Sequence, residues 1–242
     1  MTSTNLSLNN ELDAYVARPD GAGPFPAIVV LMEVFGLKRH IQQACDRLAR
    51  AGLIAVAPDI YHGQTYDYSD MDGALGHIRR LDDATVMNET GAALDWLDKE
   101  PGVDPRRLGV AGFCMGGRFA FLAASRHADR LRAAACFYGG GIAPEGEDRF
   151  GRTPPIREAE AIKGPVFLGY GADDQSIGPD EHGRIAATLT GLKKRYSLSV
   201  YPGAGHGFLC EERASYAPAA AAEAWPEAID FLHRELVQRG RD

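Results

Sequence analysis

The chain has 242 residues, enough for one large domain or two small ones. Hydrophobic residues make up 45% of it and charged residues 24%, a balance that excludes a disordered chain. The formal net charge is −7, from 26 basic and 33 acidic residues, and no basic run stands out, so we expect no nucleic-acid partner.

The sequence shows no targeting or membrane segment. Its longest apolar run, residues 27–32, stops at Glu33, far short of the roughly 20 residues that a membrane span needs. The first seven residues have neither a basic flank nor an apolar stretch, and four cysteines are too few for a disulfide scaffold. We therefore expect a cytoplasmic protein without a membrane partner, either a monomer or a weak homo-oligomer.

In the first half of the chain, short apolar runs alternate with amphipathic segments. Residues 27–32 and 53–58 are apolar runs that predict strands buried on both faces. Apolar residues recur at helical spacing in 36–50 and 83–99. The stretch from 61 to 83 is polar and rich in Tyr, Asp and Gly, so we expect an excursion over the strand ends with a short helix.

The second half repeats this alternation. Strands that alternate with helices predict a mostly parallel sheet with helices on both faces. No repeat or linker divides the chain, so the sequence predicts a single α/β domain over residues 1–242. The predicted strands are 108–113, 133–138, 165–170 and 196–201, and the predicted helices are 116–128, 180–192 and 217–238.

Cys114 lies between a predicted strand and a predicted helix, with Gly112 two residues before it and Gly116 two residues after it. This is the G-x-nucleophile-x-G elbow, in which small flanking residues let the strand and helix approach closely. The N–H of Met115, at the helix N-terminus, can stabilise an oxyanion, and the same helix end favours a thiolate. A buried structural cysteine beside packing glycines is the alternative that this motif alone leaves open.

Two later features follow strands of their own. Asp173 and Asp174 come after one predicted strand, and His206, flanked by glycines, comes after the next. The order nucleophile, acid, histidine is that of the α/β-hydrolase fold. The spacing from Gly171 favours Asp174 as the acid that orients the histidine, with Asp173 as the alternative.

Glu33 ends the strand at 27–32, so it lies at the carboxyl edge of the sheet, where ligands of open α/β sheets bind. In this fold the first strand-to-helix loop supplies a second oxyanion N–H, which nominates Val34. The alternative is that Glu33 is a solvated carboxylate at the end of a strand.

Taken together, these segments resemble the dienelactone hydrolase (carboxymethylenebutenolidase) family, which comprises cysteine hydrolases of the α/β-hydrolase fold. The resemblance runs from about residue 12 to residue 236. It is carried by Met32–Gly36, Ala57–Tyr61, Gly112–Gly117, Phe137–Gly139, Gly171–Asp174 and Gly205–Phe208.

The resemblance implies a role for each site residue. Cys114 is the nucleophile, His206 the base and Asp174 the orienting acid. Glu33 holds the resting thiol and helps to activate it once substrate binds. We also expect Tyr138 and Phe208, which lie in the matching segments, to contact the substrate.

The arginines depart from the family pattern. Members that act on dienelactone carry arginines that grip the substrate carboxylate, one of them a few residues after the catalytic histidine. Here the nearest arginine after His206 is Arg213. Arg79 and Arg80 are candidates for the other position, although we favour surface ion pairs as their role.

We therefore expect a thiol-dependent hydrolase that cleaves a lactone or activated ester through a Cys114 acyl-enzyme. A broader carboxylesterase or thioesterase is the nearest alternative, and a ligand-binding or redox-sensing protein on the same fold is another. The other histidines lack metal-ligand spacing, so we expect no metal and no cofactor. We interpret these histidines as surface residues, namely His40, His77, His127, His182 and His233.

Overall fold

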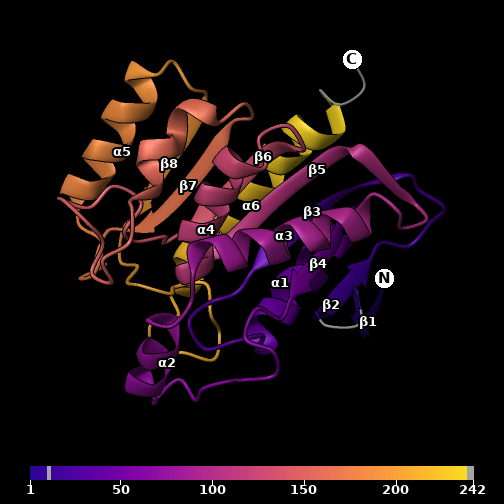
Figure 1. Ribbon diagram of the computed structural model, residues 1–242, viewed down its shortest axis with the longest axis horizontal. Helices are drawn as coiled ribbons and strands as arrows, with labels where there is room; N and C mark the ends of the chain where they lie inside the picture. The colour runs from indigo at the N-terminus through magenta and orange to yellow at the C-terminus, as the bar shows by residue number, and fades with distance from the viewer. Residues whose placement is uncertain (10–11, 239–242) are drawn as a thin grey trace.

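One mixed β-sheet runs through the centre of the computed structural model, which describes residues 1–9 and 12–238 (Figure 1). Over these residues the sheet has eight strands in the order β1-β2-β4-β3-β5-β6-β7-β8. Strands β3 to β8 are parallel, β2 is antiparallel to β4, and β1 is antiparallel to β2. The strands are β1 (Thr2–Ser7), β2 (Asp13–Arg18), β3 (Phe25–Leu31), β4 (Ile54–Pro58), β5 (Val103–Phe113), β6 (Leu131–Phe137), β7 (Val166–Gly171) and β8 (Tyr196–Tyr201).

Helices cover both faces of the sheet. On one face, Arg118 of α4 donates to Asp83 of α3, and on the other the Arg47 guanidinium of α1 lies over the Trp225 ring of α6. The helices are α1 (Arg39–Arg50), α2 (Met71–Ile78), α3 (Asp83–Leu97), α4 (Met115–Arg126), α5 (Pro179–Gly191) and α6 (Pro218–His233), with a 3₁₀ helix η1 (Pro155–Ala161) and a π-helical turn η2 (Arg234–Gln238).

The central strands are buried on both sides, as parallel strands covered by two helical layers should be. Residues 27–31 of β3 have no exposed surface, and the Trp225 ring packs 5.7 Å from the rings of both Phe113 and Phe137. Because the parallel strands run in the same direction, their carboxyl ends meet at one edge of the sheet. The loops that follow β3, β5, β7 and β8 leave from this edge.

The predicted α/β architecture with its mostly parallel sheet is confirmed. Each predicted strand and helix is present, with ends shifted by a few residues, and the polar excursion contains α2. The terminal helix differs, because α6 ends at His233 and the chain continues as a π-helical turn. Residues 10–11 and 239–242, which the predicted domain includes, lie outside the described residues.

The strands β1 and β2 were not predicted. β1 is a polar strand at the edge of the sheet and is almost entirely exposed, so its sequence carries no alternation of buried and exposed residues. None of the helices in the described residues combines the length and apolar character that crossing a membrane requires.

Candidate active site

Cys114 occupies a strained turn between β5 and α4. Its φ of 55° and ψ of −118° give it a positive-φ backbone conformation that residues other than glycine rarely adopt. The turn depends on the flanking glycines. A Cβ on Gly112 would lie 1.9 Å from the Gly116 oxygen, and a Cβ on Gly116 would lie 2.1 Å from the Leu31 oxygen. The sequence thus forms the elbow predicted from its glycine spacing.

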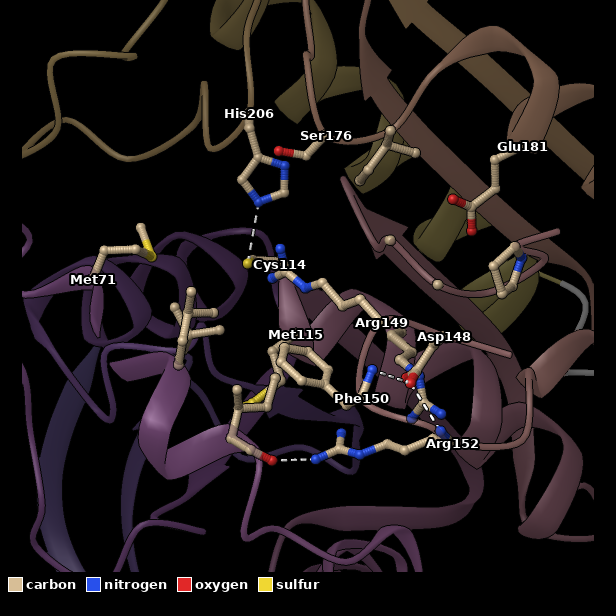
Figure 2. A pocket seen from close by; sticks show the side chains of 18 of the residues that line it. Met71, Cys114, Met115, Asp148, Arg149, Phe150, Arg152, Ser176, Glu181 and His206 are labelled. Atoms are coloured by element: carbon tan, nitrogen blue, oxygen red, sulfur yellow. Dashed lines mark hydrogen bonds and ion pairs between the residues drawn. The ribbon is translucent and has the colours of Figure 1, made fainter. Parts of the chain in front are cut away.

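The Cys114 side chain begins a chain of three contacting residues, and Figure 2 shows the first contact, between Cys114 and His206. Its Sγ lies 3.1 Å from Nε2 of His206, and Nδ1 of His206 lies 2.8 Å from Oδ2 of Asp174. These residues follow β5, β8 and β7, so the sheet edge brings together groups that are up to 92 positions apart. The nucleophile, base and acid predicted from the sequence therefore converge.

Asp174 is the aspartate that contacts His206. It is buried, and its Oδ1 accepts hydrogen bonds from the N–H groups of Ser176 at 2.7 Å and Ile177 at 3.2 Å. Asp173 is exposed. The loop after β7 therefore fixes one carboxylate against the imidazole and turns the other toward solvent.

The surroundings of His206 favour its protonated form. Burial disfavours a charged ring, but the neighbouring Cys114 sulfur and the Asp174 carboxylate outweigh it and raise the pKa of His206 to about 10. Burial also disfavours the charged form of Asp174 and would raise its pKa. The hydrogen bond with His206 outweighs burial, and the pKa of Asp174 is lowered. The site therefore favours an imidazolium between two acceptors, the sulfur and the carboxylate.

A cavity of about 390 Å³ opens in front of Cys114 and His206. Val34 and Met115, whose N–H groups were predicted to hold an oxyanion, both line it. The N–H of Met115 is in the first turn of α4, where amides have no acceptor within the helix. The Cys114 sulfur and the two residues that could donate hydrogen bonds to an oxyanion therefore line the same cavity.

The four residues expected to contact substrate are not among those that line the cavity in the described chain. Arg79 and Arg80 are exposed at the C-terminal end of α2. Tyr138 and Phe208 are fully buried, with the Tyr138 ring 5.4 Å from the His206 ring and Phe208 packed behind it at 5.5 Å. These aromatic residues support the imidazole instead of facing the cavity.

The cavity contains arginines that the sequence analysis did not single out. Arg118 and Arg152 form ion pairs with Asp83. Arg149, in the loop between β6 and η1, extends along the cavity toward Cys114 (Figure 2), and within the described residues no carboxylate pairs with it. A loop rich in Arg, Glu and Pro has no periodicity that would indicate which side chain turns inward.

The contacts of Glu33 differ from the expectation that it holds the Cys114 thiol. It is buried, but no hydrogen bond joins it to Cys114 in the part of the chain described. Its carboxylate lies 3.7 Å from Nη1 of Arg213, which also lines the cavity. The sulfur faces His206 instead, so the structure does not hold the resting thiol through Glu33.

His40 is likewise not a surface residue. It is 3% exposed, because the start of α1 packs it edge-on against Phe113. Cys210 is buried in the loop after His206, where its Sγ contacts the Tyr68 hydroxyl at 3.5 Å. Neither residue lines the cavity in front of Cys114.

Comparisons with known proteins agree with this fold. Residues 12–236 match the model of the dienelactone hydrolase family. A protein of Synechocystis sp., provisionally named as a carboxymethylenebutenolidase, is 33% identical over 94% of each chain. A Bradyrhizobium protein provisionally named as a 2-oxo-3-(5-oxofuran-2-ylidene)propanoate lactonase is 32% identical over 92% of this chain and 89% of its own.

Among solved structures, a provisionally named dienelactone hydrolase from Klebsiella pneumoniae superposes with a TM-score of 0.88 at 30% identity. The match covers 96% of this chain and 98% of that one. Family match, sequence relatives and fold agree over nearly the whole length. The chain therefore belongs to the dienelactone hydrolase family and is a hydrolase of that class.

Proposed function

We propose that this protein hydrolyses a lactone or activated ester through a covalent acyl-enzyme on Cys114. The observation that carries the proposal is the contact chain from Cys114 through His206 to Asp174, at the mouth of a cavity. A nucleophile, a base and a group that orients the base are the parts that acyl transfer requires. A binding protein would need none of the acid–base partners.

In the first half-reaction the Cys114 thiolate attacks the substrate carbonyl carbon. The oxyanion that develops is held by the N–H groups of Met115 and Val34, both on the cavity wall. When the intermediate collapses, the carbon–oxygen bond of the ester breaks and His206 gives its proton to the leaving oxygen. The acyl group is then a thioester on Cys114.

In the second half-reaction water attacks the thioester. His206, now neutral, takes a proton from this water, and collapse of the intermediate breaks the carbon–sulfur bond. The acid product leaves, and the Cys114 thiolate and His206 imidazolium are restored. Asp174 stays ionised throughout and keeps Nδ1 of His206 protonated, as its 2.8 Å contact requires.

The thiolate is a good leaving group, and this restricts the substrate. An opened lactone keeps its hydroxyl tethered to the acyl group, so the hydroxyl can re-attack the thioester before water does. A lactone whose leaving group is a stabilised enolate resists this reversal, because the enolate is a weak nucleophile. We therefore expect activated lactones to be better substrates than simple alkyl esters.

We also propose that the substrate carries a carboxylate, which Arg149 binds. Arg149 is the cavity arginine without a carboxylate partner among the described residues, and its guanidinium extends toward the reactive sulfur (Figure 2). A free guanidinium matches the two oxygens of a carboxylate. Arg213, paired with Glu33 at 3.7 Å, is the second cation on the cavity wall that could contribute.

The test compares the wild type with Cys114→Ala on a panel of activated lactones, aryl esters and thioesters. We expect kcat to fall by about 10⁴-fold or more in the variant. Cys45→Ala is the matched control, since Cys45 is fully buried in α1 and should leave turnover unchanged. Turnover that survives in Cys114→Ala would overturn the mechanism, and no wild-type turnover on any substrate would favour a binding protein.

A further inference from the structure

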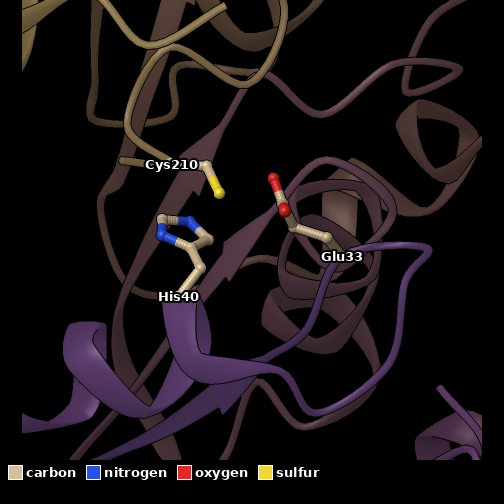
Figure 3. A group of neighbouring side chains, drawn as sticks. All are labelled: Glu33, His40 and Cys210. Atoms are coloured by element: carbon tan, nitrogen blue, oxygen red, sulfur yellow. The ribbon is translucent and has the colours of Figure 1, made fainter. Parts of the chain in front are cut away.

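Outside the lining of the active-site cavity, three buried side chains from separate segments face one another (Figure 3). Glu33 follows β3, His40 is in the first turn of α1, and Cys210 lies in the loop after β8. One oxygen of Glu33, one ring nitrogen of His40 and Sγ of Cys210 all lie within 4.8 Å of one another. All three residues are at most 3% exposed.

The polar atoms of this cluster are poorly satisfied. Glu33 Oε1 and His40 Nε2 are buried and have no hydrogen-bond partner, and Arg213 Nη1 beside Glu33 also has none. Its 3.7 Å distance from Glu33 Oε1 suits an ion pair but is too long for a hydrogen bond. Buried polar atoms almost always have hydrogen-bond partners, because a buried polar atom without one destabilises the fold.

We propose that Glu33, His40 and Cys210 form a binding site for a thiophilic divalent cation, with Zn²⁺ as the best fit. A thiolate sulfur, an imidazole nitrogen and a carboxylate oxygen are the three ligand types that zinc takes from proteins. Ligand atoms in a tetrahedral zinc site lie roughly 3.5 Å apart, so the side chains need to draw together by about an ångström. Water completes the coordination.

The charge balance also suits a divalent cation. Forming the sulfur–metal bond expels the Cys210 thiol proton to solvent, so the bound site holds one thiolate, one carboxylate and one neutral imidazole. Their two negative charges balance the two positive charges of Zn²⁺. A buried site requires such a balance, because an uncompensated buried charge is costly.

Arg213 would compete with the metal for Glu33. Both are cations, and Glu33 is the carboxylate that Arg213 pairs with. Arg213 also lines the cavity in front of Cys114, so it has room to turn toward that cavity when the metal takes its partner. Metal occupancy would then change the charge that the substrate meets. This consequence rests on the proposed function, whereas metal binding does not.

The experiment titrates the full-length protein with Co²⁺, whose thiolate complexes absorb light through sulfur-to-metal charge transfer. Because Cys114 and His206 could also bind a metal, all measurements use Cys114→Ser. We expect this variant to show the charge-transfer band, and Zn²⁺ to abolish it by displacement. Adding Cys210→Ala should remove the band, whereas adding Cys45→Ala, the matched buried control, should leave it.

Two further variants sharpen the test. Adding His40→Gln should weaken Co²⁺ binding by about 100-fold or more, because it removes a direct ligand. Adding Arg213→Gln should strengthen binding by about tenfold or more, because it removes a neighbouring cation. Unfolding midpoints without metal verify that each variant is folded.

A missing band in Cys114→Ser, or a band that survives Cys210→Ala, would overturn the proposal. So would Arg213→Gln binding the metal no more tightly than its parent. No substrate enters these measurements, so failure of the proposed ester or lactone turnover would leave their result unaffected.

Discussion

The proton on His206 connects the chemistry of the site to the stability of the fold. Its imidazolium lies between the Cys114 sulfur at 3.1 Å and the Asp174 carboxylate at 2.8 Å. Although burial opposes the charge, these neighbours raise the pKa of His206 from 6.5 to about 10. The folded protein therefore holds this proton in a pH range where the unfolded chain has released it.

The difference between the pKa of His206 in the folded and unfolded states predicts how the free energy of unfolding changes with pH. The stabilisation from protonated His206 is fully present below pH 6.5, falls between pH 6.5 and about 10, and is lost above that. Because the proposed Cys114 thiolate lacks a proton that the unfolded chain keeps up to about pH 8.5, the loss relative to His206→Asn should fall in the upper part of this window, at up to about 1.4 kcal/mol of unfolding free energy per pH unit. Denaturant unfolding of both proteins across the window measures the difference, and a difference that does not change with pH would contradict the raised pKa.

Glu33 is a residue whose contacts sequence reasoning did not predict. Its place at the end of β3 was predicted, but the direction of its carboxylate was not, because that depends on Arg213, 180 positions further along the chain. The Glu33 carboxylate lies 3.7 Å from the Arg213 guanidinium. A single side chain at a strand end carries no sign of which distant cation it will meet.

The structure consequently predicts that Glu33 does not control the reactivity of the resting thiol. In Glu33→Gln the rate of Cys114 alkylation by iodoacetamide should stay within about threefold of the wild type, since no hydrogen bond joins the two residues. In His206→Asn the rate should fall by about tenfold or more, because the imidazole that lies 3.1 Å from the sulfur and can accept the thiol proton is lost. An alkylation rate in Glu33→Gln well above threefold that of the wild type would show that Glu33 holds the thiol after all, because loss of a nearby carboxylate favours the thiolate.

At the scale of elements, the strand–elbow–helix unit of β5, Cys114 and α4 was predictable because its signals are local. Glycines at fixed positions mark the turn, and residues 108–113 of the strand before it form a continuous apolar run. The edge strand β1 was not predictable, because it owes its place to backbone pairing with β2 and not to burial of its side chains.

The elbow's close packing gives a test by substitution. Gly116→Ala should destabilise the protein by about 2–3 kcal/mol, because its Cβ would lie 2.1 Å from the Leu31 backbone oxygen. Gly76→Ala in α2 is the matched control, since no atom lies within 4 Å of the added Cβ, and it should be neutral or stabilise by about 0.5–1 kcal/mol. Equal unfolding free energies for the two variants would show that the elbow can relax.

At the scale of the whole molecule, the parallel sheet assembles the site from loops that are far apart in sequence. The order of Cys114, Asp174 and His206 along the chain, each after its own strand, was enough to predict that they meet. The cavity wall was less predictable. The loop between β6 and η1 folds over the sheet edge through contacts with distant parts of the chain, such as Arg152 with the carbonyl of Leu81.

The position of Arg149 in this wall leads to a prediction about selectivity. Arg149→Gln should raise KM for a carboxylate-bearing lactone by about tenfold or more and leave KM for a neutral aryl ester nearly unchanged, because only the anion uses the guanidinium. Arg79→Gln is the matched control, since Arg79 is exposed and does not line the cavity. Steady-state kinetics on the two substrates would contradict this role if KM rose equally for both.

The central claim is that the acyl group passes through Cys114, and mass spectrometry of the intact protein tests it most directly. The wild type is mixed with an activated lactone or ester, quenched in acid during turnover, and digested. We expect the protein mass to rise by that of one acyl group, and the adduct to map to the peptide that contains Cys114. Turnover without an adduct at any quench time, or an adduct on another residue that Cys114→Ala retains, would contradict it.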